Sequence, residues 1–218
     1  MEKKNITELV FIVDKSGSMY GRESDTVGGI NAVLDANRKL DGEVLVSVVL
    51  FNEGTKVLRD RDSIKDVPAL TLQDYSCDGC TALLDAVGGS IKHINRVQRY
   101  MPWGHKADKV IFVITTDGME NSSRKYTYSK VKEMISSKTN EGWEFLFLGA
   151  NIDAASEAGR LGIEEDRACD YVCDTAGNAA MYASVAEATC CMRQAAPQAR
   201  VGGSWKASIF ADKASRFK

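Results

Sequence analysis

The sequence predicts an α/β protein with a doubly wound, mostly parallel six-stranded sheet, one antiparallel edge strand and helices on both faces. Two observations carry this prediction. Runs of large and β-branched apolar residues recur along the chain, and they are too continuous for strands with one solvated face, which is typical of buried parallel strands. Between these runs, apolar residues recur at helical spacing. Strand and helix therefore alternate, which favours a doubly wound sheet.

Four of the apolar runs are predicted to be buried parallel strands, and they cover residues 8–13, 43–51, 109–115 and 144–149. A short run at residues 56–58 follows Asn52-Glu53-Gly54. We expect this run to return in the antiparallel direction as an edge strand. Residues 168–173 are the sixth candidate strand.

Helical spacing marks the segments between the strands. The predicted helices cover residues 27–40, 82–97, 127–137, 154–161 and 178–195. In the second of these, Leu83, Val87, Ile91 and Ile94 fall on one face. Asp153 directly precedes the fourth helix and is expected to be its N-cap, because Asp is one of the preferred residues there.

Two glycine pairs fall near or within predicted helices, at Gly28-Gly29 and Gly88-Gly89. A glycine in a helix interior costs roughly 1 kcal/mol relative to alanine. We therefore expect a packing reason for these residues, in which the helix backbone approaches the sheet closely. The alternative is a helix that starts later than the pattern suggests, with the glycines shaping the backbone near the loop that follows the first strand.

Composition is that of a single globular domain, with 218 residues of which 44% are hydrophobic. The formal charge of −2 argues against nucleic-acid binding by bulk electrostatics, which requires a basic surface. No run approaches the ~20 apolar residues that span a bilayer, and no signal-peptide pattern follows the first apolar run. We therefore expect a cytoplasmic location, with neither nucleic acid nor membrane as a partner.

Residues 1–197 are predicted to form the α/β domain, and residues 198–218 to form a basic C-terminal tail. The tail holds five basic residues against one acidic residue. We expect its few apolar side chains, Trp205, Ile209 and Phe210, to pack it as a strand or helix. A docking segment for a partner is the alternative.

The first strand leads into a group of oxygen-bearing side chains. Residues 10–19 read V-F-I-V-D-K-S-G-S-M, so Asp14 ends the strand and Ser16 and Ser18 follow at alternate positions. Thr81 in C-D-G-C-T-A-L-L and Asp117 in V-I-F-V-I-T-T-D-G-M-E-N add further oxygens. Ligands of open α/β sheets bind beyond the carboxyl ends of the strands. Magnesium prefers near-octahedral oxygen ligands, so we predict a site for a small, hard cation here.

With these residues the chain resembles the von Willebrand factor type A family. That family's metal-ion-dependent adhesion site consists of D-x-S-x-S, a distant Thr, and a distant Asp followed by Gly. The matching residues, in order, are Asp14, Ser16, Ser18, Thr81 and Asp117. The order of strands and helices also matches over about residues 5 to 195. Thr81 comes just before a predicted helix, so its hydroxyl would either cap that helix or face the metal.

The resemblance implies a metal-dependent protein-binding module without catalytic activity. A divalent cation, Mg²⁺ with Mn²⁺ or Ca²⁺ as alternatives, would be about neutral between two aspartates and would accept a carboxylate from an acidic residue of a partner protein. Intracellular bacterial-type members often accompany AAA+ ATPases. An adaptor of such an ATPase in metal insertion or stress response is therefore the alternative function.

An enzyme is the second alternative, as a magnesium-dependent phosphoryl-transfer protein. An Asp after a buried strand is typical of haloacid-dehalogenase-type phosphotransferases, but these need a second Asp two residues on, where this chain has Ser16. There is no Walker glycine-lysine pattern, and the motif offers no base to activate Ser16 or Ser18. We therefore predict that the protein is not an enzyme.

We call the segments around residues 14–18 and Asp117 the first and second metal loops. The residues that follow each loop are predicted to form a rim that selects the partner. Tyr, Met and Arg are enriched at protein interfaces. The candidate rim residues are Met19, Tyr20, Arg22, Met119, Glu120, Asn121, Arg124, Tyr126 and Tyr128.

Cys77 and Cys80 form a C-x-x-C pair just before Thr81. Such a pair is found in zinc and redox sites. A structural zinc site needs four ligands, and no second pair completes one. We expect reduced thiols, with redox control of the metal loop as the alternative.

Overall fold

The computed structural model describes residues 5–196, 199 and 201–216. Its six strands are β1 (Ile6–Asp14), β2 (Glu43–Phe51), β3 (Thr55–Ser63), β4 (Lys109–Thr116), β5 (Glu144–Ala150) and β6 (Ala168–Tyr171). They form one sheet in the order β3-β2-β1-β4-β5-β6. Only β3 pairs in the antiparallel direction, at an edge. The predicted fold class is confirmed.

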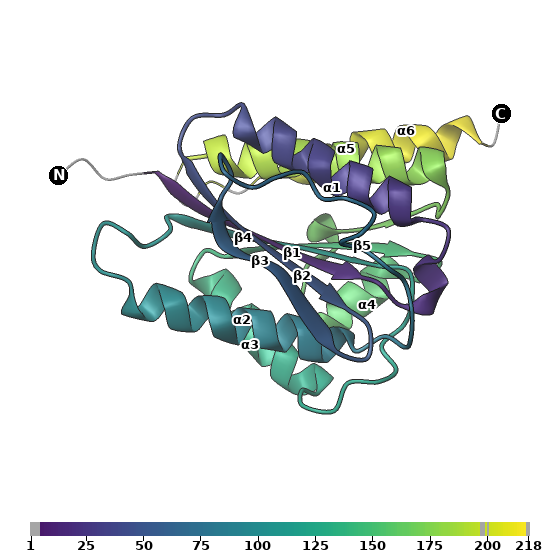
Figure 1. The fold of residues 1–218 in the computed structure, drawn as a ribbon, viewed down its shortest axis with the longest axis horizontal. Coiled ribbons are helices and arrows are strands. Elements are labelled where there is room, and N and C mark those ends of the chain that lie inside the picture. The colour runs from purple at the N-terminus through teal and green to yellow at the C-terminus, as the bar shows by residue number, and fades with distance from the viewer. Residues whose placement is uncertain (1–4, 197–198, 200, 217–218) are drawn as a thin grey trace.

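The helices cover both faces of the sheet. They are α1 (Glu23–Arg38), α2 (Leu83–Tyr100), α3 (Tyr128–Asn140), α4 (Ala154–Leu161), α5 (Thr175–Gln194) and α6 (Ala207–Ser215), with short 3-10 turns η1 (Gly17–Met19), η2 (Glu165–Arg167) and η3 (Gly203–Lys206). Figure 1 shows α1, α5 and α6 on one face and α2, α3 and α4 on the other. None of the helices in the described ranges is long and apolar enough to cross a membrane.

Alternate residues of each central strand enter two separate cores. In β1, Leu9 and Phe11 belong to the core beneath α1 and α5, whereas Val10 and Ile12 belong to the core beneath α2 and α3. This two-sided burial is the physical reason for the continuous apolar runs, because neither face of the strand meets water.

β3 is the element that departs most from the prediction, since it has nine residues instead of the three at 56–58. Its sequence T-K-V-L-R-D-R-D-S carries few apolar residues and is mostly exposed or half-buried. An edge strand pairs its backbone with only one neighbour and does not need apolar side chains along its whole length. The apolar residues of the sequence therefore do not mark where it begins and ends. Its register with β2 shifts on both sides of Val48, which marks an irregularity in the pairing.

Helix starts also differ from the predicted ones. α1 begins at Glu23 and α5 at Thr175, each three or four residues earlier than expected. In α5 the reason is a cap, because the Asp174 side chain accepts a hydrogen bond from the Gly177 N–H at 2.8 Å. The same cap ends β6 at Tyr171, before the expected Cys173. The predicted N-cap Asp153 of α4 is confirmed.

One glycine of each pair has the expected packing reason, but the neighbour is a tyrosine side chain instead of the sheet. A Cβ atom on Gly29 would lie 1.9 Å from the Tyr182 ring, and one on Gly88 would lie 2.5 Å from the Tyr126 ring. Gly28 and Gly89 have no described atom within 4 Å of that position. Each pair therefore contains one glycine that lets a helix pack against an aromatic ring.

The C-terminal segment packs on α5 through its apolar residues, as expected. Trp205 is 1% exposed and Ile209 is buried in the same core as α1 and α5, whereas Phe210 is 54% exposed. The Trp205 indole N–H donates to the Asp166 carbonyl at 3.2 Å. The predicted boundary between residues 197 and 198 lies outside the described residues.

Replacing Trp205 with alanine removes a large side chain from the core. We expect Trp205→Ala to lower the free energy of unfolding by about 3–5 kcal/mol, the usual cost of such a cavity. Phe210→Ala on the same segment is the control, and it should change stability by about 0.5 kcal/mol or less. Urea denaturation of both variants checks this. Equal effects of the two would show that Trp205 is not part of the core.

Arg216 joins the end of α6 to the start of α5 by two hydrogen bonds to the Asp174 carboxylate, at 2.5 and 2.8 Å. These bonds, together with the Gly177 N–H, lower the pKa of Asp174 to about 2. A lowered carboxyl pKa stabilises the fold above the unfolded pKa, and the stabilisation is lost as pH falls toward the folded pKa.

We therefore expect the wild type to be more stable than Asp174→Asn at pH 7, because asparagine keeps the cap but loses the charge. The difference should shrink below about pH 4, the ordinary pKa of Asp. Urea denaturation between pH 7 and pH 3 measures it. A difference that does not change with pH would contradict this assignment.

Candidate metal site

The predicted metal loops lie at the point where the winding of the sheet reverses. β1 ends at Asp14 and β4 ends at Thr116, directly before Asp117, and these two strands are neighbours. From β1 the chain proceeds to β2 and β3 on one side and later to β4, β5 and β6 on the other. The carboxyl ends of such neighbouring strands form the crevice in which doubly wound proteins bind ligands.

The Asp14 side chain is held on both oxygens. Its Oδ1 accepts the backbone N–H of Ser16 at 2.7 Å, and its Oδ2 accepts the hydroxyl of Thr116 at 2.6 Å. The Tyr75 hydroxyl donates to the Asp14 backbone carbonyl. The carboxylate is therefore fixed in one orientation and is buried.

The turn after Asp14 brings the two serines to the second aspartate. η1 places Ser16 Oγ and Ser18 Oγ 3.1 Å apart. The Ser18 hydroxyl donates to Asp117 Oδ1 at 2.5 Å. Four of the five predicted ligands are thus linked in one hydrogen-bonded group.

Thr81 reaches the same place from another part of the chain. A Cβ atom on Gly118 would lie 3.2 Å from Thr81 Oγ1 and 3.7 Å from Ser18 Oγ. The glycine after Asp117 therefore leaves room for these hydroxyls. Thr81 is not the N-cap of α2, because Ala82 holds that position and its methyl group cannot accept a hydrogen bond. The Thr81 hydroxyl therefore does not cap α2, which was one of the two roles predicted for it from sequence.

Both carboxylates are buried next to neutral groups. Burial raises the pKa of Asp14, and the nearby Asp117 charge raises it further; burial also raises the pKa of Asp117. Across the part of the chain that is described, neither carboxylate has an ion pair with a basic side chain. Two negative charges with hydroxyls around them and no basic partner are a donor set that fits a hard divalent cation.

The described residues contain no cluster of three or more His, Cys, Asp or Glu that could hold a metal ion. A site here would therefore depend on the serine and threonine hydroxyls as much as on the two aspartates. Cys77 and Cys80 are free thiols. Burial raises the pKa of Cys77 to about 11, so this thiol is protonated at neutral pH and is a weak nucleophile for redox chemistry.

The loop that contains these cysteines is bound to the first metal loop. The Gly17 N–H donates to the Gly79 carbonyl at 3.0 Å, and the Asp78 N–H donates to the Lys15 carbonyl at 2.9 Å. Lys15 also pairs with the Asp78 carboxylate at 2.6 Å. These contacts bring the segment before Thr81 alongside the serines.

Some of the candidate rim residues are exposed to solvent, and the others are buried or bonded within the protein. Tyr20 is 80% exposed and Met119 is 60% exposed, and Arg124 is exposed as well. Met19 is buried, because it closes the η1 turn against the interior. The other rim candidates are half-buried or bonded within the protein: Arg22, Glu120, Asn121, Tyr126 and Tyr128.

Thr116 and Tyr75 both bond to Asp14, and neither was among the candidates from sequence. Thr116 had a local signal, because it directly precedes Asp117 at the end of a buried strand. Tyr75 had none, since its contact with Asp14 spans 61 positions in the chain.

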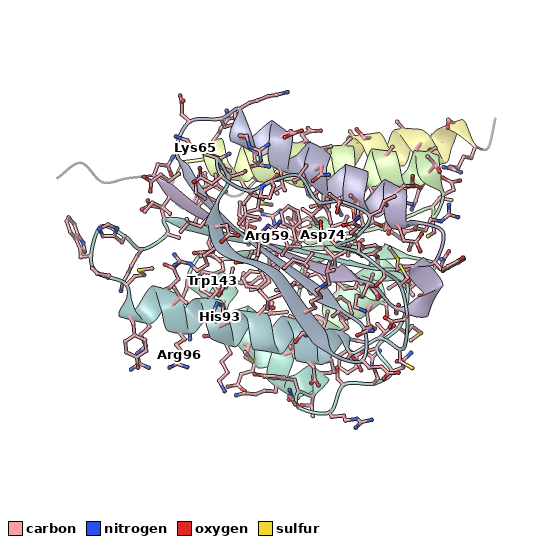
Figure 2. The ribbon with its side chains drawn as sticks, in the orientation of Figure 1. Arg59, Lys65, Asp74, His93, Arg96 and Trp143 are labelled. Carbon is pink, nitrogen blue, oxygen red and sulfur yellow. The ribbon has the colours of Figure 1, made fainter. Side chains whose placement is uncertain are left out.

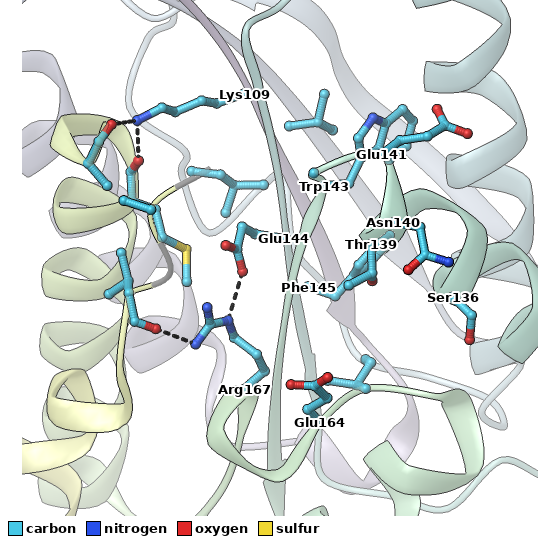
Figure 3. A pocket seen from close by; sticks show the side chains of 18 of the residues that line it. Lys109, Ser136, Thr139, Asn140, Glu141, Trp143, Glu144, Phe145, Glu164 and Arg167 are labelled. Carbon is cyan, nitrogen blue, oxygen red and sulfur yellow. Dashed lines mark hydrogen bonds and ion pairs between the residues drawn. The ribbon is translucent and has the colours of Figure 1, made fainter. Parts of the chain in front are cut away.

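A cavity of about 690 Å³ lies at the opposite ends of the strands, where β4 and β5 begin. Figure 3 shows Lys109 and Arg167 at this cavity, each bonded to neighbouring groups of the protein. Lys109 donates to the carbonyls of Met192 and Arg193, and Arg167 pairs with Glu144 at 2.7 Å. This cavity contains none of the predicted site residues.

No family model and no curated protein sequence matches the chain, but solved structures do. The vWF domain of the type V pilus tip protein Mfa5 from Porphyromonas gingivalis is 12% identical, with a TM-score of 0.63 over 88% of this chain and 98% of that one. A von Willebrand factor type A protein from Catenulispora acidiphila is 20% identical, with a TM-score of 0.58 over 87% and 43%.

Proximal thread matrix protein 1 from the mussel byssus is 17% identical, with a TM-score of 0.60 over 87% of this chain. The chain spans 47% of that protein's length. At these identities the likeness concerns the fold alone. The fold is that of von Willebrand factor type A domains.

Thr116 is a suitable residue for testing the geometry of the site. Thr116→Val keeps the shape of the side chain but leaves one oxygen of a buried carboxylate without its donor. We expect the metal-free protein to lose about 1–3 kcal/mol of unfolding free energy. Ser184→Ala is the control, because the buried Ser184 hydroxyl has no hydrogen-bond partner among the described groups and its removal should cost nothing. Denaturant unfolding in chelator measures both, and an unchanged Thr116→Val would contradict the assigned bond.

Proposed function

We propose that the protein is a metal-dependent protein-binding module. A divalent cation, Mg²⁺ in our proposal, is held by the group of oxygens described above and takes a carboxylate from an acidic residue of a partner protein. The ligands are Asp14, Ser16, Ser18, Thr81 and Asp117. One observation carries the proposal: two buried carboxylates share one place with hydroxyls, and neither pairs with a basic side chain of the described residues.

Charge explains why such a site would prefer an acidic ligand. A divalent cation is balanced by Asp14 and Asp117, and the hydroxyls of the remaining ligands are neutral. The bound ion would supply positive charge and an open coordination position for one more oxygen. A carboxylate satisfies both, because hard cations favour anionic oxygen ligands.

Exposed apolar residues beside the site would add contact area around the partner's carboxylate. Tyr20 lies two residues after Ser18, and Met119 lies two residues after Asp117; both are largely exposed. Large aromatic and thioether side chains are enriched in protein interfaces. In this proposal the metal provides the anchor, and Tyr20 and Met119 provide specificity.

Structures with the same fold support the choice of a divalent cation. The mussel proximal thread matrix protein has been solved with zinc in its MIDAS motif, the metal-ion-dependent adhesion site, and that structure has a TM-score of 0.56 and 18% identity to this chain. The pilus tip protein Mfa5 is a second protein with this fold.

The surroundings of the serines favour binding over catalysis. Ser16 bonds to Ser18, and the Ser18 hydroxyl donates to Asp117, whose carboxylate is a ligand of the cation in this proposal. His93 lies on α2, where its ring pairs with Asp60 at 2.8 Å (Figure 2). A serine nucleophile needs a base that is free to take its proton, and in this proposal the cation engages the Asp117 carboxylate.

Calorimetric titration with Mg²⁺ tests the metal site. Asp117→Asn should weaken binding at least tenfold, since it removes one of two charges that face the cation. Glu133→Gln is the control, because Glu133 is an exposed carboxylate on α3 that pairs with Lys130 and lies outside the site. Equal Mg²⁺ affinity in folded Asp117→Asn would refute the proposal.

Capture experiments test the partner. A protein retained by wild type with Mg²⁺ should be lost with chelator, with Asp117→Asn, and when the partner's own acidic residue becomes an amide. Tyr20→Ala should weaken capture about tenfold while Mg²⁺ affinity stays unchanged, as expected for an exposed interface residue. Loss of Mg²⁺ binding in Tyr20→Ala would show that Tyr20 supports the metal loop instead of the interface.

A further inference from the structure

The proposed ligands come from three segments of the chain. Asp14, Ser16 and Ser18 lie on one continuous turn, whereas Thr81 and Asp117 are 36 positions apart and belong to different loops. The segment after Asp117, residues 118–126, binds to the start of α2, directly after Thr81. We call residues 118–126 the clamp loop.

Asn121 of the clamp loop holds both main-chain groups of Thr81. The Thr81 N–H donates to Asn121 Oδ1 at 2.9 Å. In return, the Thr81 carbonyl accepts the Asn121 N–H at 3.0 Å and the Ser122 N–H at 3.3 Å. Thr81 is thereby fixed to the loop that carries Asp117, although it precedes a different helix.

Glu120 supplies the cap that α2 lacks. Its Oε2 accepts the Leu84 N–H at 2.9 Å, and its Oε1 accepts the Ser122 and Ser123 N–H groups at 2.9 and 2.7 Å. The Ser123 hydroxyl donates to Glu120 and accepts the Asp85 N–H at 3.0 Å. A carboxylate at a helix N-terminus satisfies free N–H groups and is favoured by the helix dipole.

A side chain of α2 also binds the backbone of the clamp loop. Asp85, in the first turn of α2, accepts the N–H groups of Arg124, Lys125 and Tyr126 at 3.0, 2.8 and 2.9 Å. Tyr126 then packs its ring against Gly88 one turn further along. The clamp loop and the start of α2 are therefore joined by side chains from both segments.

We infer that Asn121 and Glu120 are positioning residues of the metal site, which set its affinity for the cation by holding the Thr81 hydroxyl beside Asp117. Neither residue is a proposed ligand. This inference rests on the proposed function, because it assigns a role toward the same cation. A ligand that is already in place does not have to be ordered when the ion binds, so preorganisation strengthens binding.

The alternative is that these contacts only stabilise the fold. Stability and metal affinity separate the two readings, because a purely structural contact lowers the melting temperature without changing the affinity of the folded protein for Mg²⁺. Lys125 provides a matched control: it lies in the clamp loop, donates its backbone N–H to Asp85 and has an exposed side chain.

The experiment is calorimetric titration of the full chain with Mg²⁺, with thermal melting in chelator recorded for each variant. Asn121→Ala should weaken Mg²⁺ binding about 10- to 100-fold, the range usual for residues that orient metal ligands. Lys125→Ala should bind as wild type, because alanine keeps the backbone N–H that Asp85 accepts. Asn121→Asp keeps the acceptor oxygen for the Thr81 N–H and should restore binding to at least the wild-type level.

Glu120→Gln is the second variant, for the case that Asn121→Ala does not fold. It should weaken Mg²⁺ binding several-fold, because an amide N–H₂ would face an N–H donor at the start of α2. Mg²⁺ affinity within twofold of wild type in folded Asn121→Ala or folded Glu120→Gln would overturn the inference. Asp117→Asn measured in parallel separates the two proposals: if it binds Mg²⁺ as wild type, the metal site itself is refuted.

Discussion

Asp14 and Asp117 are buried side by side at the ends of two neighbouring strands, and the rest of the site depends on that arrangement. Two buried carboxylates without a basic partner are costly, because charge is poorly solvated in the protein interior. Hydroxyl and backbone donors lessen the cost: Thr116, Ser18 and the Ser16 N–H each donate to one of the carboxylates. A bound divalent cation would remove most of what remains, so folding and metal binding would be linked at this point.

The sheet brings the aspartates together, whereas the loops decide which hydroxyls join them. Parallel pairing of β1 with β4 places the ends of both strands at one edge. Gly17 and Asp78 connect the first metal loop to the segment before Thr81, and the clamp loop connects Thr81 to Asp117. Hydrogen bonds between loops therefore bring together candidate ligands from distant parts of the chain. The side chains of Tyr20 and Met119 beside these loops are exposed.

The opposite edge of the sheet is built differently. There the charged side chains Lys109 and Arg167 bind carbonyl and carboxylate groups of the protein itself, around the cavity shown in Figure 3. Trp205 and Ile209 extend the core on the side of α5. At this edge the charged groups of Lys109 and Arg167 are bonded within the protein. At the edge with the candidate metal site, Asp14 and Asp117 have no cationic partner among the described residues.

The sequence by itself determined the fold class and named the residues of the candidate site. Strands buried on both faces need continuous apolar residues, and the spacing of Asp14, Ser16 and Ser18 brings their side chains together within one turn. The tertiary structure alone decided the length of β3, whose single-sided backbone pairing leaves no apolar pattern. It also decided that Glu120 and Asn121 bind Leu84 and Thr81, the basis of their proposed positioning roles. Those roles depend on contacts 36 to 40 positions apart in the chain, and such contacts follow from how α2 packs beside the loop, which no local pattern of residues records.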